Sequence, residues 1–386
     1  MTLAEWLFWI SFGCIAYTYA LYPAALAAAC AFQRLWRRPG GRPSTSRFAS
    51  AWPTISLVIP AFNEEKHLAA KLRNLAELDY PSDSLEIIFV SDGSTDATDL
   101  LISRAELPGL RYLRIASRQG KPTALNAGVA AAGNEILVFS DAATLFACDA
   151  IEKLARHFAD PRVGVVCGTV EFAPTPDGPH TEGLYWQYER WMREREARIG
   201  AATTASGAIY AVRRAAYRPL PADAILDDLL VPMTARKLGY RIEQEPEARA
   251  LEPAAATLHG EFARRARLAA GGFRSLRQLG ACATASPSVF WAFFSHKLLR
   301  WLSPVFLLAL LGTSLALRGQ PIYRFALAGQ LAFYLWALAG MTFRERLGGV
   351  RFALVGYFVM AMNAALLVGL ARALAGRQPV TWIRVN

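Results

Sequence analysis

Acidic side chains stand at the ends of short apolar runs in this 386-residue chain. Glu64 and Asp92 follow the first two runs, Asp141 follows a later one, and the pair Asp227-Asp228 lies further along. A carboxylate can accept hydrogen bonds from a ligand, hold a divalent cation, or take a proton from a hydroxyl group within hydrogen-bond reach. These residues are therefore the first candidates for binding and catalysis.

The first two carboxylates require a strand, a helix and a strand to position them. The runs ISLVIP (55–60) and LEIIFV (85–90) predict buried strands, and the leucines between them fall on one helix face. Two such strands joined by a helix are parallel, and a parallel sheet binds ligands at the carboxyl ends of its strands. Glu64 and Asp92 lie just past two such ends, which suits a polar ligand such as a nucleotide.

A cation follows the third predicted strand, LRYLRI (110–115). Gly120-Lys121 opens a predicted helix, whose free N–H groups, dipole and lysine all suit a phosphate group. A solvated lysine is the alternative when this feature is taken alone. Further strands are predicted over 135–140 and 163–172, and helices over 181–198 and from Asp227 onward.

The residues that follow these strands carry a family resemblance. P-A-F-N-E after the first strand and S-D-G-S-T-D after the second resemble the opening signature of the family 2 glycosyltransferases, and G-K-x-x-A-L-N-x-G resembles their third motif. The resemblance implies an α/β fold of the Rossmann-like A-type glycosyltransferase class, with a mostly parallel sheet, and a nucleotide-sugar donor. The alternative is an ordinary α/β domain with an acidic turn.

The same resemblance implies which residues bind the donor. Asp92 would hydrogen-bond a uracil, Glu64 would lie near the ribose, and Lys121 would lie near the diphosphate. The donor-binding set from the first motifs is Pro60, Asn63, Glu64, Asp92, Ser94, Lys121 and Asp141.

The family usually carries D-x-D after the fourth strand, where two carboxylates contact the ribose and a divalent cation. Asp141 matches the first carboxylate, but Ala143 stands at the second position. One carboxylate and diphosphate oxygens can still bind Mg²⁺, which keeps most of its waters. We therefore expect Mg²⁺ or Mn²⁺ with Asp141 as its protein ligand, and Thr144 as a neutral contributor.

The acceptor side is implied by two further segments. Ser206 and Gly207 resemble a segment that lines the acceptor pocket, where small residues allow close approach to the backbone. Asp227 and Asp228 match the last two positions of T-E-D, which supplies the general base of an inverting displacement. Helix capping is the alternative for this pair.

An arginine-rich segment resembles the family's Q-x-x-R-W, with Arg264 at the Gln, Arg267 at the Arg and Leu268 at the Trp. With Arg265 these side chains suit a diphosphate, because a guanidinium forms paired charge-assisted hydrogen bonds. A basic helix on anionic lipid is the alternative, and both roles are compatible.

The bulk composition points to a membrane protein with a soluble middle. Hydrophobic residues make up 54% of the chain and gather at its two ends, and the net charge is +11. Arginines cluster beside the apolar runs, and no nucleic-acid motif is present, so we expect no nucleic-acid partner. The five cysteines are scattered and suggest neither disulfides nor a zinc site.

These patterns predict five regions: an N-terminal transmembrane helix (1–33), a basic Pro/Gly-rich linker (34–53), a cytoplasmic glycosyltransferase domain (54–272), an interfacial amphipathic segment (273–297) and a membrane region with about three spans (298–386). A cleaved signal peptide is the alternative for the first region. With four spans, Arg344 and Arg346 lie inside, whereas Arg372 and Arg377 lie outside unless one segment is re-entrant.

Together these inferences predict an inverting glycosyltransferase in the bacterial inner membrane, multi-pass, with its catalytic domain in the cytoplasm. A nucleotide sugar, UDP-linked, would be the hexosyl donor. A lipid, a lipid-linked glycan or a growing exopolysaccharide would be the acceptor, and subunits of a polysaccharide export system would be partners. The alternative is a non-catalytic component that binds nucleotide sugars for a partner synthase, motivated by Ala143.

Overall fold

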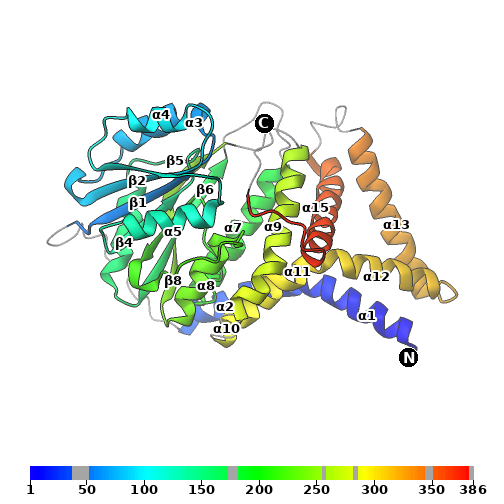
Figure 1. Cartoon of the computed structure of the whole chain (residues 1–386). Helices are drawn as coiled ribbons and strands as arrows, with labels where there is room; N and C mark the ends of the chain where they lie inside the picture. The colour runs from blue at the N-terminus through cyan, green and yellow to red at the C-terminus, as the bar shows by residue number, and fades with distance from the viewer. Residues whose placement is uncertain (37–51, 173–180, 254–257, 281–285, 344–350, 382–386) are drawn as a thin grey trace.

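The computed structural model describes residues 1–36, 52–172, 181–253, 258–280, 286–343 and 351–381. Figure 1 shows a sheet domain on one side and long helices on the other, with α9 (Leu258–Leu279) and α7 (Thr181–Arg198) between them. The expected linker residues 37–51, with Arg37, Arg38, Arg42 and Arg47, lie outside the described residues, as do Arg344 and Arg346.

An eight-stranded sheet forms the core of the first part, in the order β3-β2-β1-β4-β7-β6-β8-β5. Strands β3, β2, β1 and β4 are parallel, and β7 runs antiparallel to both β4 and β6, whereas β6 and β8 are parallel. The strands are β1 (Ile55–Ala61), β2 (Leu85–Asp92), β3 (Leu110–Ile115), β4 (Ile136–Ser140), β5 (Leu145–Phe146), β6 (Val163–Phe172), β7 (Ile209–Arg213) and β8 (Arg241–Glu252). The predicted α/β fold with a mostly parallel sheet is confirmed.

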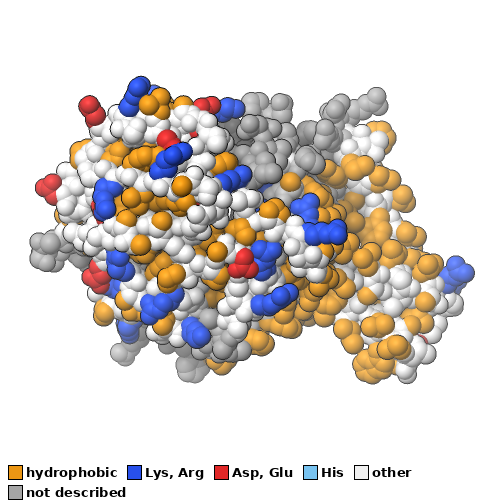
Figure 2. Space-filling model, viewed as in Figure 1, with side chains coloured by type: hydrophobic (Ala, Val, Ile, Leu, Met, Phe, Trp, Pro, Cys, Tyr) orange, Lys and Arg blue, Asp and Glu red, His pale blue; other side chains and the backbone are white. Residues whose placement is uncertain are grey.

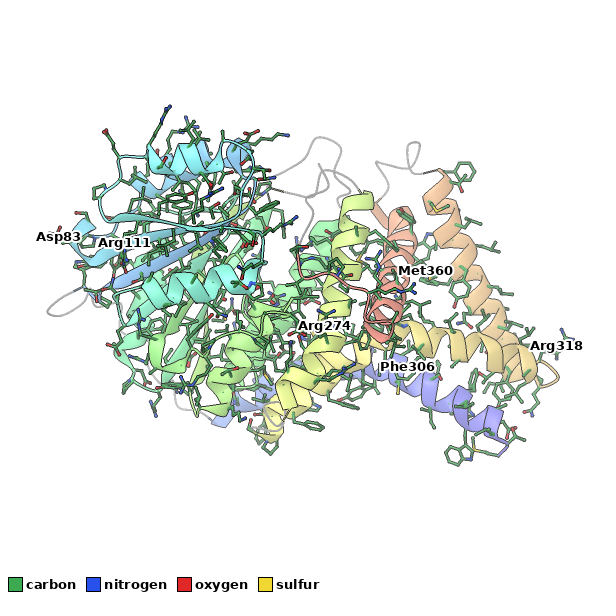
Figure 3. All side chains as sticks on the ribbon, viewed as in Figure 1. Asp83, Arg111, Arg274, Phe306, Arg318 and Met360 are labelled. Carbon is green, nitrogen blue, oxygen red and sulfur yellow. The ribbon has the colours of Figure 1, made fainter. Side chains whose placement is uncertain are left out.

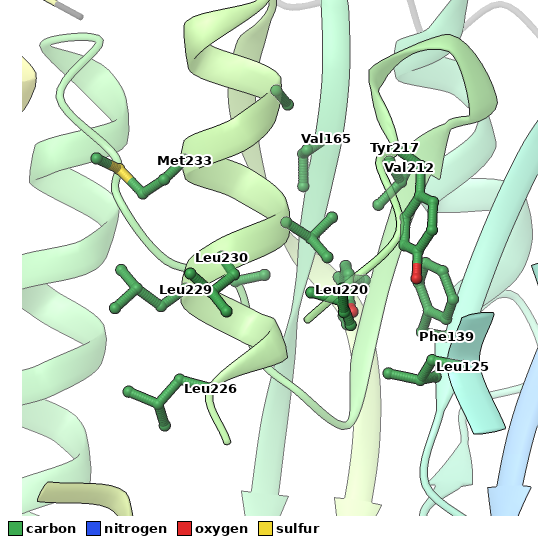
Figure 4. Packing of buried hydrophobic residues seen from close by; sticks show 14 of the residues in the cluster. Leu125, Phe139, Val165, Val212, Tyr217, Leu220, Leu226, Leu229, Leu230 and Met233 are labelled. Atoms are coloured by element: carbon green, nitrogen blue, oxygen red, sulfur yellow. The ribbon is translucent and has the colours of Figure 1, made fainter. Parts of the chain in front are cut away.

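Both faces of the parallel half are covered, which explains why its strands are continuous apolar runs. Every residue of β1 is buried. Successive residues point to opposite faces, so Leu57 joins the cluster under α3 (Glu65–Ala76) and α4 (Thr98–Ser103), whereas Val58 joins the cluster under α5 (Lys121–Ala131) and α8 (Asp227–Lys237). Figure 4 shows the second cluster, where Leu220 lies between the leucines of α8 and the pair Leu125 and Phe139.

A close approach of helix to sheet depends on Gly128 in α5. A β-carbon built at this position would lie 2.4 Å from the Val58 side chain and 3.1 Å from Val90. Glycine therefore lets α5 pack directly on β1 and β2, which sets the position of the Lys121 end of this helix.

The C-terminal half of the sheet was less predictable from the sequence. The expected strand over 163–172 is β6, but β7 and β8 were not predicted. Charged residues alternate with buried ones along β8, since one face of this strand is solvated. The motif segment at Ser206 therefore leads into a strand, and its antiparallel register against β4 places it beside Asp141 in the fold.

Apolar helices form the second part of the molecule. α1 (Leu3–Ala16) and α2 (Tyr22–Trp36) are joined by a π-helical turn, Tyr17–Leu21. Within the described residues, three helical stretches are long and apolar enough to cross a membrane: Leu3–Leu35, Pro321–Thr342 (α13) and Val355–Leu374, which is part of α15 (Arg351–Leu374). In Figure 2 hydrophobic side chains gather over this part, whereas charged side chains are scattered over the sheet domain.

The expected span over 298–317 is broken. The helices Pro287–Trp301 and Ser303–Ala316 (α12) form a pair bent by 57°, which is either one broken span or a re-entrant loop. The proline at the start of α12 accounts for the break, because it cannot donate the backbone hydrogen bond that continues a helix. Helix α9 runs without interruption through the expected boundary at 272/273.

Candidate active site

The loops after β1 and β2 are tied together by the first motif residues. The Asn63 backbone N–H donates to Ser94 Oγ at 3.2 Å, and the Thr95 N–H donates to Asn63 Oδ1 at 2.8 Å. Asn63 has a φ of 53°, which asparagine tolerates better than most residues. Asn63 and Ser94 thus shape the loop that leads to Glu64. Glu64 lines a large cavity together with Pro60 of β1, whereas Asn63 and Ser94 do not line it.

Asp92 is fully buried and supports a turn. Its two carboxylate oxygens accept the backbone N–H groups of Gln119 and Gly120, each at 2.7 Å. Gly120 has a φ of 103°, a conformation that favours glycine. Asp92 does not line the cavity and acts on it through the turn that carries Lys121. Its expected contact with uracil stays a prediction.

Lys121 joins two of the predicted carboxylates. Its Nζ lies 2.8 Å from Asp141 Oδ1 and 3.5 Å from Asp227 Oδ1. Burial alone would lower the pKa of Lys121, but the attraction of Asp141 and Asp227 outweighs it and raises that pKa above its ordinary value. The site therefore holds a permanent cation at the sheet edge.

Asp227 and Asp228 begin α8, but their surroundings differ. Asp227 is buried and accepts a hydrogen bond from the Tyr210 hydroxyl at 3.2 Å. Burial raises the pKa of Asp227 to about 6, against the attraction of Lys121. Asp228 is half-buried and lines the cavity, so a ligand in the cavity can reach its carboxylate.

The predicted acceptor residues lie beside Asp228. A β-carbon built at Gly207 would lie 3.6 Å from the Asp228 β-carbon, and Ser206 and Gly207 both line the cavity. The Ala205 N–H donates to the Asp228 carbonyl at 2.7 Å, which fixes this loop against the start of α8. Glycine at 207 therefore leaves room directly in front of the carboxylate.

The three predicted arginines lie on α9 and line the same cavity. Glu261 accepts hydrogen bonds from Arg264 Nε at 2.7 Å and from Arg265 Nε. Burial lowers the pKa of Arg267, and the charges of Asp227, Asp141 and Asp228 act in the opposite direction. Arg267 therefore faces the acidic cluster.

One cavity of about 1480 Å³ brings most of the predicted residues together. Its walls include Asp141, Asp227 and Asp228, three carboxylates far apart in sequence. The predicted residues that line it are Pro60, Glu64, Lys121, Asp141, Ser206, Gly207, Asp227, Asp228, Arg264, Arg265 and Arg267, and those that do not are Asn63, Asp92 and Ser94.

The predicted metal ligand has an ammonium partner. Ala143 is buried, and no group of three or more His, Cys, Asp or Glu side chains that could hold a metal is found among the described residues. Asp141 is bound to Lys121 instead. The residues present therefore fit a divalent cation only if a ligand supplies most of the coordinating oxygens.

Lys71 supports the Asp141 loop and was missed by the motif analysis. It is fully buried in α3, and its Nζ donates to Ser140 Oγ at 2.7 Å and to the Thr144 carbonyl at 2.6 Å. Burial lowers the pKa of Lys71 to about 7, opposed by Asp141. Its position three residues after Leu68, on the apolar face of α3, could have revealed it.

The segment after α15 also contributes to the site. Arg372, Arg377 and Val380 line the cavity. A β-carbon built at Gly120 would lie 3.1 Å from Val380 Cγ1, so this segment packs on the turn that carries Lys121. Of the two arrangements that the sequence left open, this contact favours the one with a re-entrant segment, and the number of spans stays a prediction.

Comparisons with known proteins relate the chain to glycosyltransferases. Residues 56–220 match the model of glycosyl transferase family 2. The chain is 26% identical over 251 residues to an N-acetylglucosaminyltransferase of Rhizobium meliloti, and 28% identical over 229 residues to a poly-beta-1,6-N-acetyl-D-glucosamine synthase of Staphylococcus aureus. The matches cover 59% and 58% of this chain, and 58% and 55% of those relatives, so the chain spans little more than half of their length.

A solved structure extends the comparison to nearly the whole fold. The mannosyltransferase PcManGT from Pyrobaculum calidifontis, in complex with GDP-Man and Mn²⁺, superposes with a TM-score of 0.72 at 22% identity. The superposition covers 96% of this chain and 99% of that one. At this identity the likeness shows the fold, including the apolar helices beside the sheet domain.

Proposed function

Since the chain carries a family 2 glycosyltransferase domain over residues 56–220, we propose that it transfers a sugar, with inversion, from a nucleotide sugar to a lipid, a lipid-linked glycan or a growing exopolysaccharide. The observation that carries this proposal is the meeting of Asp141, Lys121, Asp227 and Asp228 in one cavity. It joins groups suited to a diphosphate with a reachable carboxylate.

Asp228 is the proposed general base. An acceptor hydroxyl beside Gly207 gives its proton to this carboxylate while its oxygen forms a bond to the anomeric carbon of the donor. The bond from that carbon to the diphosphate breaks on the opposite face, so the configuration inverts in one displacement. Asp227 holds Lys121 in place, since it is buried and 3.5 Å from that ammonium.

The donor diphosphate is proposed to lie between Lys121 and the α9 arginines. Guanidinium groups bind diphosphate oxygens in pairs, and a fixed ammonium stabilises the charge of the leaving group. Asp141 would hold a divalent cation, Mg²⁺ or Mn²⁺, and such a cation would supply Lewis-acid stabilisation of the leaving diphosphate. The Mn²⁺ of the mannosyltransferase structure supports this assignment.

UDP-N-acetylglucosamine is the first donor to test, because both curated relatives carry N-acetylglucosamine in their names. GDP-mannose is the second, since it is bound by the structural neighbour. Asp92, Glu64, Asn63 and Ser94 are the proposed nucleotide side of the site.

We place the enzyme in the bacterial inner membrane, with residues 54–272 in the cytoplasm. Subunits of a polysaccharide export system are its proposed partners. Three spans and a re-entrant bent pair put the end of α15 on the cytoplasmic side. This count is supported by the packing of Val380 on the Gly120 turn. Residues 273–297 would then lie at the membrane surface, where Phe290 and Phe294 are exposed.

A second candidate function is nucleotide-sugar binding without catalysis, on behalf of a partner synthase. Ala143 favours it, because it leaves the metal position without a second carboxylate. The Lys121–Asp141 ion pair favours it too, because it engages the first carboxylate. This function predicts nucleotide binding but no turnover with any metal.

Release of free nucleotide from UDP-N-acetylglucosamine by the purified full chain, with Mg²⁺ or Mn²⁺ and extracted lipids, tests the proposal. Asp228→Asn should lower turnover about 10²–10⁴-fold, because it removes the base and keeps the shape of the side chain. Asp223→Asn is the matched control, since Asp223 is exposed on the loop before α8. Unchanged turnover in Asp228→Asn would overturn the assignment of the base, and binding without turnover would favour the second function.

A further inference from the structure

The cavity that holds the carboxylates is also lined by α15. Val355, Phe358, Val359, Met362 and Leu366 contribute to its wall. We propose that this wall binds the alkyl chain of the acceptor, and hence that the acceptor is a lipid-linked glycan whose linking group is a phosphate. The inference rests on the proposed function and deepens it by naming the acceptor class.

The α15 residues form one continuous stripe. Their spacing of three, one, three and four residues places them on a single face of the helix. From Val355 to Leu366 the stripe is about 16 Å long at 1.5 Å per residue. All five side chains are apolar. Asn363 of the same helix also lines the cavity, but its amide bonds within the protein, accepting from Ser303 Oγ at 2.7 Å and donating to the Val359 carbonyl at 2.9 Å.

This stripe lies on a helix that is long and apolar enough to cross a membrane. The neighbouring Leu367 is 36% exposed and Leu374 is 80% exposed, so α15 has an outer apolar face as well. Figure 1 places α15 beside α9 on the side of the other apolar helices, and Figure 3 labels Met360 on it. The cavity therefore joins the carboxylates to the depth of the helices that would lie in a bilayer.

An alkyl chain is the ligand that matches such a wall. A nucleotide sugar or a bare glycan would have to leave its hydroxyl groups unpaired against aliphatic side chains, which is costly. A methylene chain gains about 25 cal/mol for each Å² that it buries. If the acceptor were a glycan without a lipid, the apolar stripe would make no favourable contact with it.

Basic side chains supply a site for the linking phosphate. Arg193 of α7 and Lys297 and Arg300 of the bent pair line the same cavity. Glu189 binds Arg300, and Glu196, which binds His296 at 2.7 Å, is a second carboxylate of this cluster. The three cations outnumber the two carboxylates, which favours an anionic group. The phosphate would lie here, with the alkyl chain along α15 and the sugar hydroxyl at Asp228.

Photo-crosslinking tests this site without any need for turnover. The probe is dodecyl phosphate with a diazirine on its alkyl chain, added to the full chain in nanodiscs, and crosslinked peptides are identified by mass spectrometry. We expect labelling of the Val355–Leu366 stripe, and about a tenfold loss of it in Met362→Trp, since a bulky ring fills a pocket shaped for methylenes. Leu367→Trp, one helix face away, should retain the labelling of the stripe.

The two variants also separate this inference from the proposed function. Labelling spread equally over the outer positions of α15 and α13, and unchanged by Met362→Trp, would mean contact with surrounding lipid and would overturn the inference. Met362→Gln replaces Met362→Trp if the bulkier variant fails to fold, and it should weaken labelling in the same direction. Absence of nucleotide release in the wild type would count against the proposed function, whereas the labelling pattern would still report on the site.

Discussion

Asp227 carries its charge in a buried position, with Tyr210 and Lys121 as its partners. Because its pKa rises from 3.8 to about 6 in the fold, the folded state binds a proton more tightly than the unfolded chain between these values. The carboxylate therefore destabilises the fold increasingly as pH rises through this window, and the full cost is present at pH 7. A buried charge of this kind is expected where function requires it.

Asp227→Asn should raise the stability of the protein near neutral pH while lowering its activity. The amide keeps an oxygen for Tyr210 and removes the buried charge, so the free energy of unfolding should rise by roughly 1–3 kcal/mol at pH 7.5 and by little at pH 4.5. Turnover should fall at least about tenfold, since Lys121 loses one of its two anchors. Thermal unfolding in detergent at both pH values measures the difference. A stability difference that does not change with pH would contradict the assigned cause.

At the scale of elements, α3 and the loop after β4 depend on one another. Lys71 of α3 is the group that donates to Ser140 and to the Thr144 carbonyl, and so holds the loop on which Asp141 stands. Its pKa is lowered from 10.5 to about 7, so the folded state releases this proton more readily than the unfolded chain between pH 7 and 10.5. The free energy of unfolding therefore increases as pH rises from 7 to 10.5, because the buried amine loses its charge. Below pH 7 Lys71 is charged in both states, and the full cost of burying the charge remains.

Lys71→Met should loosen the Asp141 loop. The thioether keeps the apolar volume but leaves the Thr144 carbonyl without its donor, which costs about 1–3 kcal/mol. We expect turnover to fall about tenfold with a raised KM for the donor, because a small displacement of a positioned group weakens catalysis strongly. The difference in unfolding midpoint between wild type and variant should increase from pH 7 to pH 10. Lys66→Met, on the exposed side of the same helix, is the control.

Elements whose local pattern and tertiary environment agree could be predicted from the sequence. β1 and β2 are buried on both faces, as their continuous apolar runs indicate. β8 could not be predicted, because its sequence is rich in charged residues and its neighbours in the sheet come from distant segments. The place of Lys71 on the apolar face of α3 indicates burial, but its role could not be predicted, because its partners Ser140 and Thr144 come from a distant segment.

At the scale of the whole molecule, the motifs placed Asp141 and Asp228 in one site, as the structure has them. The sequence did not reveal that the membrane-side helices complete this site. The α15 wall and the segment after it line the cavity together with residues such as Asp141, which lies more than two hundred positions earlier in the chain. Hydropathy alone indicates only a span and the segment that follows it. The sheet domain and the apolar helices therefore line one cavity.

Arg274 tests whether the two act together, because it joins the C-terminal segment to two parts of the catalytic region. From α9 its guanidinium donates to the Gln378 carbonyl at 2.9 Å and to the Asp223 carbonyl at 3.2 Å (Figure 3). Arg274→Ala should release the segment that packs Val380 on the Gly120 turn, and so reduce donor affinity about three- to tenfold through a less ordered Lys121.

The measurement is the KM for the nucleotide sugar, with hydrogen exchange over 375–381 as the structural readout. Arg277→Ala on the same helix is the matched control, since Arg277 is exposed. Faster exchange of the segment with an unchanged KM would show that the segment does not contribute to donor binding. Unchanged exchange would show that Arg274 does not hold the segment in place. Faster exchange together with a raised KM is the outcome expected if the end of the membrane region closes the active site.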